Sequence, residues 1–224
     1  MNIVVYTAIY GDIDRLWGTN TYGVPHFAYV DSPKTEYDIA TRAPAKTPSW
    51  EQIVLPPGWD NRRSARHFKA LPHYYLPKAN IWVWLDGNVR LKISPQDLVE
   101  QFLKNDFATF KHPDRDCLYV EADFCAKAKK DDALTLNDQR GRYLLAGMPK
   151  NWGLAETRIV IRRNTPEICS INEDWWAEIE NGSLRDQVSL PYVFWKHKAT
   201  WDIIPGRCGP VKPVGPFLYM VHKT

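Results

Sequence analysis

The sequence predicts an α/β domain in which helices cover both faces of a sheet. Apolar strands and amphipathic helices alternate over the first two thirds of the chain, which is the pattern of α/β folds. Hydrophobic residues make up 44% and charged residues 25% of the 224 positions, as in ordinary globular proteins. No internal repeat and no linker divides the sequence. We therefore expect a single domain over residues 1–224.

Each expected element follows from a local pattern. Apolar or alternating runs predict strands, in chain order, at 2–10, 26–31, 50–55, 81–85, 89–93, 107–110, 158–162 and 201–204. Helical periodicity predicts helices at 61–71, from 94, at 119–129, at 134–145, from 165 and from 183. Asn61 is the expected cap of the first helix, and Ser94 and Thr165 each precede a proline, which favours the first helical position.

The composition excludes several classes of protein. The formal net charge of +3 is small beside the dense positive field of a dedicated nucleic-acid binder. The four cysteines, Cys117, Cys125, Cys169 and Cys208, lack zinc or redox spacing, so we expect reduced thiols in a soluble cytoplasmic protein without a membrane span. Motifs of dinucleotide binding, P-loops, serine-hydrolase elbows and zincins are absent. The 10 Trp, 11 Tyr and 8 Phe suit a large core or a face that stacks on sugars or bases.

Asp86-Gly87-Asn88 directly follows the strongest apolar strand. Ligands of open α/β sheets bind beyond the carboxyl ends of strands, and two oxygen-bearing side chains at i and i+2 can hold one hard cation. Such an ion would neutralise a diphosphate leaving group. The structural alternative is a hairpin turn, because Asp-Gly between alternating strands is a common hairpin signal.

Arg62, Arg66 and Lys69 fall at i, i+4 and i+7 of the first helix and share one face. Arginine forks on such a stripe fit phosphate groups. A solvated helix face explains the same charges without a ligand.

Polar residues in the second half offer two further candidate groups. The loop that contains His112, Arg115 and Glu121 can bind a polyhydroxylated substrate, although an ordinary surface loop has the same composition. Glu156 and Asp186 are candidate carboxylates near a reacting sugar, as base or hydroxyl acceptor. Asp186 also stands three residues after Ser183, which is capping-box spacing and predicts a purely structural role.

The ordered set of motifs resembles the TOD/MUCI-type glycosyltransferase-like family, once catalogued as a domain of unknown function. The matching pieces span Val4 to Trp195 and comprise Val5–Asp12, Phe27–Asp31, Arg63–Lys69, Trp82–Asn88, Lys111–Cys117, Gly153–Glu156, Ile159–Arg162 and Arg185–Ser189. The resemblance implies a GT-A-like fold with a mixed central sheet. It joins a Rossmann-like nucleotide-binding half, about residues 1–110, to an acceptor half, about 111–224.

The resemblance also implies an activity, a metal and a set of site residues. Such enzymes transfer a sugar from a nucleoside diphosphate donor to an acceptor hydroxyl, usually with Mn²⁺ or Mg²⁺. The implied donor-binding residues are Thr7, Ala8, Tyr10, Gly11, Asp12, Arg66, Lys69 and Asp86. Glu156, Asp186 and Gln187 would face the transferred sugar or its acceptor. Asp86 and Asn88 would hold the metal with a late histidine, His222 or His197, although the usual Asp-x-Asp is Asp-Gly-Asn here.

Three functions therefore remain in competition. The first is a metal-assisted glycosyltransferase that acts on a glycan or another hydroxyl acceptor. The second is a non-catalytic carbohydrate-binding module on a degenerate transferase fold, which the missing second acid and the aromatic richness favour. The third keeps the transferase but takes a modified base in DNA as acceptor.

Overall fold

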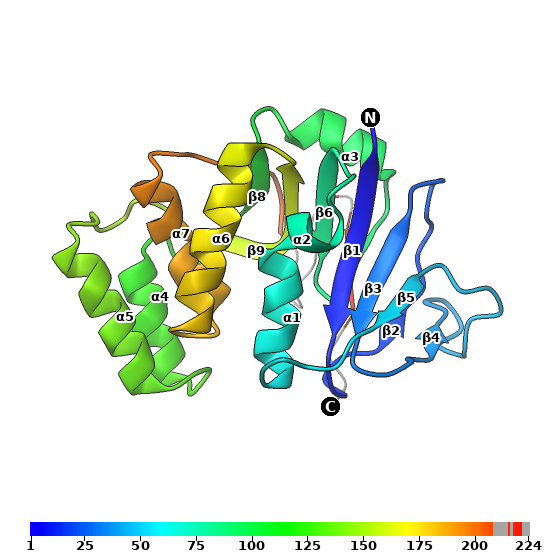
Figure 1. The fold of residues 1–224 in the computed structure, drawn as a ribbon, viewed down its shortest axis with the longest axis horizontal. Helices are drawn as coiled ribbons and strands as arrows, with labels where there is room; N and C mark the ends of the chain where they lie inside the picture. Colours follow the sequence, from blue (N-terminus) through cyan, green and yellow to red (C-terminus); the bar gives the residue numbers. More distant parts are fainter. Residues whose placement is uncertain (208–214, 216, 221–224) are drawn as a thin grey trace.

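The computed structural model describes residues 1–207, 215 and 217–220 (Figure 1). Its strands are β1 (Ile3–Ile9), β2 (Leu16–Trp17), β3 (His26–Val30), β4 (Glu36–Tyr37), β5 (Glu51–Val54), β6 (Ile81–Leu85), β7 (Val89–Leu91), β8 (Phe107–Lys111), β9 (Ala155–Arg163), β10 (Asp202–Ile204) and β11 (Phe217–Tyr219). Its helices are α1 (Asn61–Ala70), α2 (Pro72–Tyr75), α3 (Pro95–Phe102), α4 (Leu118–Lys127), α5 (Ala133–Leu145), α6 (Pro166–Glu180) and α7 (Asp186–Lys196).

A seven-stranded mixed sheet forms the centre of the molecule, in the order β10-β8-β9-β6-β1-β3-β5. Strands β5, β3, β1 and β6 run parallel to one another and form the Rossmann-like part of the sheet. Strand β9 pairs antiparallel with both β6 and β8, while β10 pairs parallel with β8. This confirms the predicted GT-A-like α/β fold. The sheet crosses the predicted boundary near residue 110, and the division into two halves stays a prediction.

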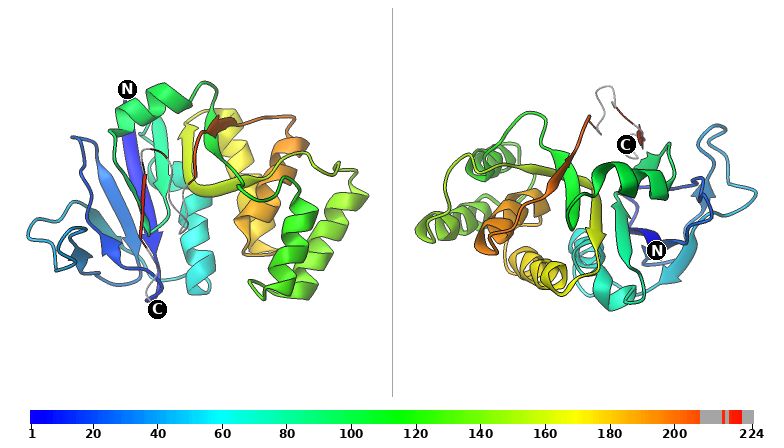
Figure 2. Two further views of the ribbon diagram at one scale, coloured as in Figure 1. Left: turned by 180° about the vertical axis from the view of Figure 1, so that it is seen from behind. Right: turned by 90° about the horizontal axis from the view of Figure 1, so that it is seen from above.

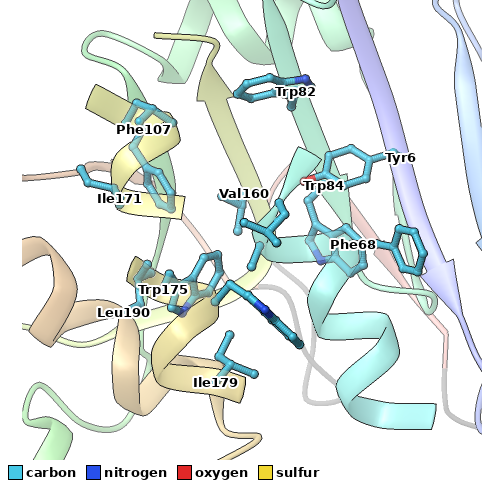
Figure 3. Close-up of a cluster of buried hydrophobic side chains, with 14 of the residues drawn as sticks. Tyr6, Phe68, Trp82, Trp84, Phe107, Val160, Ile171, Trp175, Ile179 and Leu190 are labelled. Carbon is cyan, nitrogen blue, oxygen red and sulfur yellow. The ribbon is translucent and has the colours of Figure 1, made fainter. Parts of the chain in front are cut away.

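Helices cover both faces of this sheet (Figure 2). Helices α1, α6 and α7 pack on one face through an apolar cluster that includes Phe68, Trp175 and Leu190 (Figure 3). Helix α3 and the β7–β11 ribbon cover the other face through Leu98, Val89 and their neighbours. Helices α4 and α5 pack with α7 at one end of the sheet. Among the described helices, none is both long enough and apolar enough for a membrane crossing.

The aromatic residues mainly serve the core. Six of the ten tryptophans are buried, and Trp82, Trp84 and Trp175 lie between the sheet and the helices α1 and α6 (Figure 3). Because a buried aromatic side chain removes a large apolar area from water, these residues account for much of the aromatic content. The cysteines Cys117, Cys125 and Cys169 are free thiols, while Cys208 lies outside the described residues.

Several helix boundaries follow the predicted capping signals. The Ser94 side chain accepts the Asp97 N–H at the start of α3, and the Thr165 side chain accepts the Ile168 N–H at the start of α6. The predicted cap Asn61 is wrong by one residue, because Asp60 accepts the first free N–H groups of α1. Strand β9 starts at Ala155, three residues earlier than predicted, so Glu156 lies inside the strand.

A buried arginine caps the C-terminal end of helix α1. Arg162 on β9 donates hydrogen bonds to the Lys69 carbonyl at 2.5 Å and the Ala70 carbonyl at 3.2 Å, and also to Tyr6 and Asn172. These carbonyls belong to the last turn of the helix, where no N–H of the helix itself is available. A guanidinium at this end also interacts favourably with the helix dipole.

We therefore expect Arg162→Met to destabilise the protein by about 3 kcal/mol, because buried acceptors lose their donors. Thermal unfolding should show a fall in Tm of about 6–12 °C. Arg163→Met is the matched control, since the Arg163 side chain is 38% exposed and pairs with the half-exposed Asp106. Equal losses in the two variants would contradict the capping role.

Candidate active site

The main cavity lies where the order of the parallel strands reverses. The chain passes from β1 outward to β3 and β5, and returns through α1 to β6 on the other side of β1. Ligands of open α/β sheets bind at this point, beyond the carboxyl ends of the strands. A cavity of about 450 Å³ opens there, lined by residues that follow β1 and β6, by α1, and by the starts of β9 and α7.

The predicted basic stripe of α1 faces this cavity. Arg62, Arg66 and Lys69 all line it, so the alternative of a purely solvated helix face is wrong. Lys69 is 1% exposed although it carries a charge, and its burial needs partners on neighbouring elements. Those partners come from β6, β9 and α7.

A buried polar network surrounds the Lys69 ammonium. Its Nζ lies 2.5 Å from Asp186 Oδ2 and 3.3 Å from Asp86 Oδ1, and it donates to Thr157 Oγ1 at 3.1 Å. The Thr157 hydroxyl donates in turn to Asp186 Oδ2 at 2.9 Å, and Arg66 Nε lies 3.5 Å from Asp186 Oδ1. The network therefore fixes side chains of four separate elements around one wall of the cavity.

Asp186 is held as a carboxylate by this network. Burial by itself raises the pKa of Asp186, but the charges of Arg66 and Lys69 outweigh it and hold the pKa well below its usual range. The predicted capping box is wrong, because the Asp186 side chain binds cations and Thr157, and the Ser183 hydroxyl donates to Asp131. Asp186 is thus a weak proton acceptor at neutral pH.

Glu156 has the opposite electrostatic environment. Its side chain is buried, and desolvation raises its pKa to about 7 although Arg158 Nε lies 2.6 Å from Glu156 Oε1. A carboxylate with a pKa near 7 is suited to accept a proton at neutral pH. The two candidate carboxylates therefore differ in the chemistry that they can perform.

Strand β9 contains a β-bulge beside Glu156. The pairing of β9 with β8 moves from Val160 to Glu156 across a single step of β8, between Thr109 and Phe110. The Thr109 hydroxyl donates to the carbonyls of Glu156 at 3.0 Å and Ile159 at 2.8 Å, and so holds both ends of the bulge. Bulges commonly redirect side chains beside active sites.

Asp86 is fixed by the strand that precedes it. The indole N–H of Trp84 donates to Asp86 Oδ1 at 2.8 Å, and the Asp86 N–H donates to the Arg158 carbonyl at 2.9 Å. Asp86 and Val89 form a turn, but the predicted hairpin is wrong, because β6 pairs with β1 and β9 while β7 pairs with β11. The carboxylate is therefore free to face the cavity.

The candidate metal ligands fit a cation that arrives with phosphate groups. Asp86 and Asn88 line the cavity, as does Asp14, whose Oδ2 would lie 3.2 Å from a Cβ added at Gly87. Among the described residues, no group of three or more His, Cys, Asp and Glu side chains could hold a metal. Mg²⁺ is typically bound by one or two carboxylates together with substrate phosphates. The donor set suits that mode, and a cage built by the protein alone is not formed by these residues.

Of the two candidate histidines, only His197 lies within the part of the chain that the structure describes. His197 lies at the end of α7, where its Nε2 contacts Asp174 at 2.8 Å, and it is not among the lining residues. His222 lies outside the described residues.

The other predicted donor-binding residues are divided between the cavity wall and its surroundings. Ala8 and Tyr10 line the cavity, whereas Thr7 is buried in β1 and Asp12 is exposed. Gly11 lies behind the wall at a φ of +69°, where a Cβ would meet the Asn61 side chain at 2.5 Å. The left-handed backbone conformation favours glycine at this position.

The predicted acceptor-binding residues gather around a second cavity of about 300 Å³. His112, Arg115, Glu121 and Gln187 line it, together with Glu156. The His112 Nδ1 accepts the N–H groups of Asp114 and Arg115 at 3.2 Å each, which shapes the loop. Burial lowers the pKa of His112, so this ring is neutral at pH 7.

The sequence did not point to Asp14, Arg158 and Arg185, which also line the main cavity. Arg158 stands two residues after Glu156 and Arg185 directly precedes Asp186, so their position beside candidate residues was the available signal.

This chain is similar in sequence to a family of glycosyltransferase-like domains. The model of the TOD1/MUCI70, glycosyltransferase-like domain matches residues 1–204. The chain belongs to this family. A curated relative, the probable hexosyltransferase MUCI70 of Arabidopsis thaliana, is 28% identical over 169 residues, which cover 69% of this chain and 29% of the relative. The chain thus spans less than a third of the length of that relative. A solved structure, the apo form of the bifunctional glycosyltransferase WbbM, has a TM-score of 0.44 and 11% sequence identity over 89% of this chain and 38% of its own.

The family covers all the cavity-lining residues named above, since the matched range ends at Ile204, beyond α7. The main cavity and, apart from Arg207, the second cavity of this TOD1/MUCI70 domain are therefore built within the matched range.

Proposed function

We propose that this TOD1/MUCI70 domain is a glycosyltransferase that moves a sugar from a nucleoside diphosphate to an acceptor hydroxyl. The observation that carries the proposal is the concentration of cations at the point where the strand order reverses. Five cationic side chains line the main cavity, namely Arg62, Arg66, Lys69, Arg158 and Arg185, against three acidic ones, Asp14, Asp86 and Asp186. Guanidinium and ammonium groups in a partly buried cleft suit a diphosphate leaving group.

In this proposal, Asp86, with Asp14 and Asn88 beside it, would hold a divalent cation such as Mn²⁺ or Mg²⁺ together with the donor diphosphate. When bound, the cation supplies further charge neutralisation for the departing diphosphate. The protein residues hold the donor in position, and the network around Lys69 keeps the ammonium fixed next to Asp86.

Glu156 is proposed as the general base. The acceptor hydroxyl gives its proton to the Glu156 carboxylate while its oxygen forms a bond to the anomeric carbon. The bond between that carbon and the donor phosphate oxygen breaks, and its electron pair leaves with the nucleoside diphosphate. A direct displacement of this kind inverts the anomeric configuration. The raised pKa of Glu156 and its place in the wall of the second cavity, paired with Arg158, which lines both cavities, support this role.

Asp186 then has a positioning role. Its low pKa makes proton acceptance unfavourable, but its contacts with Arg66 and Lys69 keep both cations directed at the cavity. The proposed division of labour therefore assigns proton transfer to one carboxylate and cation placement to the other.

A thermal-shift panel of nucleoside diphosphates and their sugars, each with Mn²⁺ and with EDTA, tests the function. At one hundred times its Kd, a ligand stabilises the folded state by about 2.7 kcal/mol. We expect a Tm increase of about 5–10 °C for one nucleotide series, larger with the metal than with EDTA.

The variant Arg66→Gln should reduce this shift, while Lys104→Gln, at an exposed lysine outside the cavity, should leave it unchanged. No shift with any nucleotide on folded protein would contradict the transferase and favour the carbohydrate-binding module. Binding of a donor together with a double-stranded oligonucleotide carrying a modified base would favour the DNA acceptor.

A further inference from the structure

The second cavity adjoins the donor cavity. Arg158, Arg185 and Gln187 line both cavities, whereas Glu156 lines the second one and not the first. The proposed base therefore faces the second cavity. On the proposed function, this is the side from which an acceptor hydroxyl would reach Glu156.

The wall of the second cavity carries more positive than negative side chains. Three acidic side chains line it, and each has its own cation: Asp114 with Arg207 at 3.1 Å, Glu121 with Arg115 at 2.5 Å, and Glu156 with Arg158 at 2.6 Å. The two charges within each pair neutralise one another. The charge of the cavity is then set by the cations that remain.

Two cations remain after this pairing. Lys130 and Arg185 line the cavity, and neither forms an ion pair with any residue of the described chain. The Lys130 Nζ lies 4.6 Å from the centroid of the Phe124 ring, and an Arg185 terminal nitrogen donates to Gln187 Oε1 at 3.3 Å. The Arg185 Nε is buried and has no hydrogen-bond partner among the described residues.

The counter-charge next to Arg185 is Asp186, whose pKa it helps to lower, but Asp186 is already paired with Arg66 and Lys69. A partly buried guanidinium that shares its counter-charge in this way is incompletely compensated for its reduced hydration. A carboxylate or phosphate that enters the cavity restores this compensation, and it can bind the guanidinium through two parallel hydrogen bonds. A neutral sugar hydroxyl offers neither the charge nor the bidentate geometry.

We infer that the acceptor carries an anionic group, a carboxylate or a phosphate, which binds between Lys130 and Arg185 in the second cavity. The inference rests on the proposed function, since it names the class of acceptor for the same reaction. It assigns to the second cavity a substrate-selecting role beside the catalytic role of Glu156.

Binding of matched probes by isothermal titration calorimetry, with a saturating nucleoside diphosphate, tests the inference. The probes are methyl β-glucuronide and glucose 6-phosphate, with methyl β-glucoside as the neutral counterpart. We expect at least one anionic probe to bind about 10-fold more tightly than the neutral one, a typical gain for a charge-assisted contact. The anionic probe with the lower Kd shows whether the cavity prefers a carboxylate or a phosphate.

The variant Lys130→Gln should remove most of this preference. The matched control is Lys127→Gln, which alters an exposed lysine in the last turn of α4 that lines neither cavity. Because both side chains are exposed, neither variant should impair folding, and a Tm measurement checks this. An unchanged preference in Lys130→Gln would overturn the inference.

Nucleotide binding in the same samples separates the two proposals. If nucleotides bind and neutral and anionic sugars bind equally, the inference fails and the transferase stands. If anionic sugars bind with the expected preference but no nucleotide binds, the anion site stands and the transferase fails.

Discussion

Glu156→Gln should lower kcat by about 10²–10⁴-fold and leave nucleotide binding unchanged, because the amide cannot accept the proton of the acceptor hydroxyl. In the unmodified protein the rate should rise with pH through about 7, since burial raises the pKa of Glu156 to about 7 and only the carboxylate acts as base. Transfer rates measured between pH 5 and 9 check both expectations, with the thermal shift by nucleotide as the binding readout.

Glu167→Gln is the matched control, because Glu167 is exposed in the first turn of α6 and lines neither cavity. Its rate and pH profile should be those of the unmodified protein. If Glu156→Gln keeps full activity with the same pH profile, another group takes the proton and the role of Glu156 as base is wrong.

The second large effect concerns the ion pair between Lys69 and Asp186. Asp186→Ala should destabilise the fold by about 3–5 kcal/mol, since it leaves the ammonium of Lys69 buried with a weaker counter-charge. Tm should fall by about 6–20 °C. Asp174→Ala removes an ion pair with Lys196 in which both side chains are more than a third exposed, and it should cost less than about 1 kcal/mol.

The contribution of Asp186 to stability depends on pH. The pKa of Asp186 is lower in the folded protein than in the unfolded chain, so its contribution is present at neutral pH and above. This contribution to stability is lost as the pH falls below the pKa of an unperturbed aspartate and through the lower pKa of Asp186 in the folded protein. Acid unfolding of Asp186→Ala should therefore lack part of the stability loss that the unmodified protein shows.

The double variant Lys69→Met with Asp186→Leu separates stability from function. Replacing a buried ion pair by apolar side chains is often neutral for stability. We expect its Tm to recover relative to Asp186→Ala while the nucleotide-dependent shift is reduced. A double variant as unstable as Asp186→Ala would show that apolar packing cannot replace this pair.

The fold and one wall of the site follow from local sequence. The apolar runs of β1 and β6 identify the buried parallel strands, and parallel strands bring their carboxyl ends to one edge. The same rule places Asp86 at that edge. The spacing of Arg62, Arg66 and Lys69 alone puts them on one face of α1, and this face lines the cavity.

The environment of each carboxylate could not be predicted, because it depends on elements far apart in sequence. Asp186 meets Lys69 only when the start of α7 packs against β9 and α1. Ser183 does not cap α7, because the helix begins at Asp186 with Arg185 as its N-cap residue, and the Ser183 oxygen accepts the Arg185 N–H instead. The Asp-Gly turn is not a hairpin for the same reason, since β9 occupies the position beside β6. Local spacing contains no information about these neighbours.

The wall that the two cavities share, formed by Arg158, Arg185 and Gln187, has a consequence for ligand binding. A ligand that neutralises the shared guanidinium groups from one cavity changes the electrostatic potential felt in the other. By thermodynamic reciprocity, whatever the first ligand does to the affinity of the second, the second does equally to the first. On the proposed function, donor and acceptor affinities are therefore coupled, and we expect a substitution on the shared wall to alter both. Changes intended to alter the choice of acceptor alone belong at residues that line the second cavity and not the main one, such as Lys130 or Arg207.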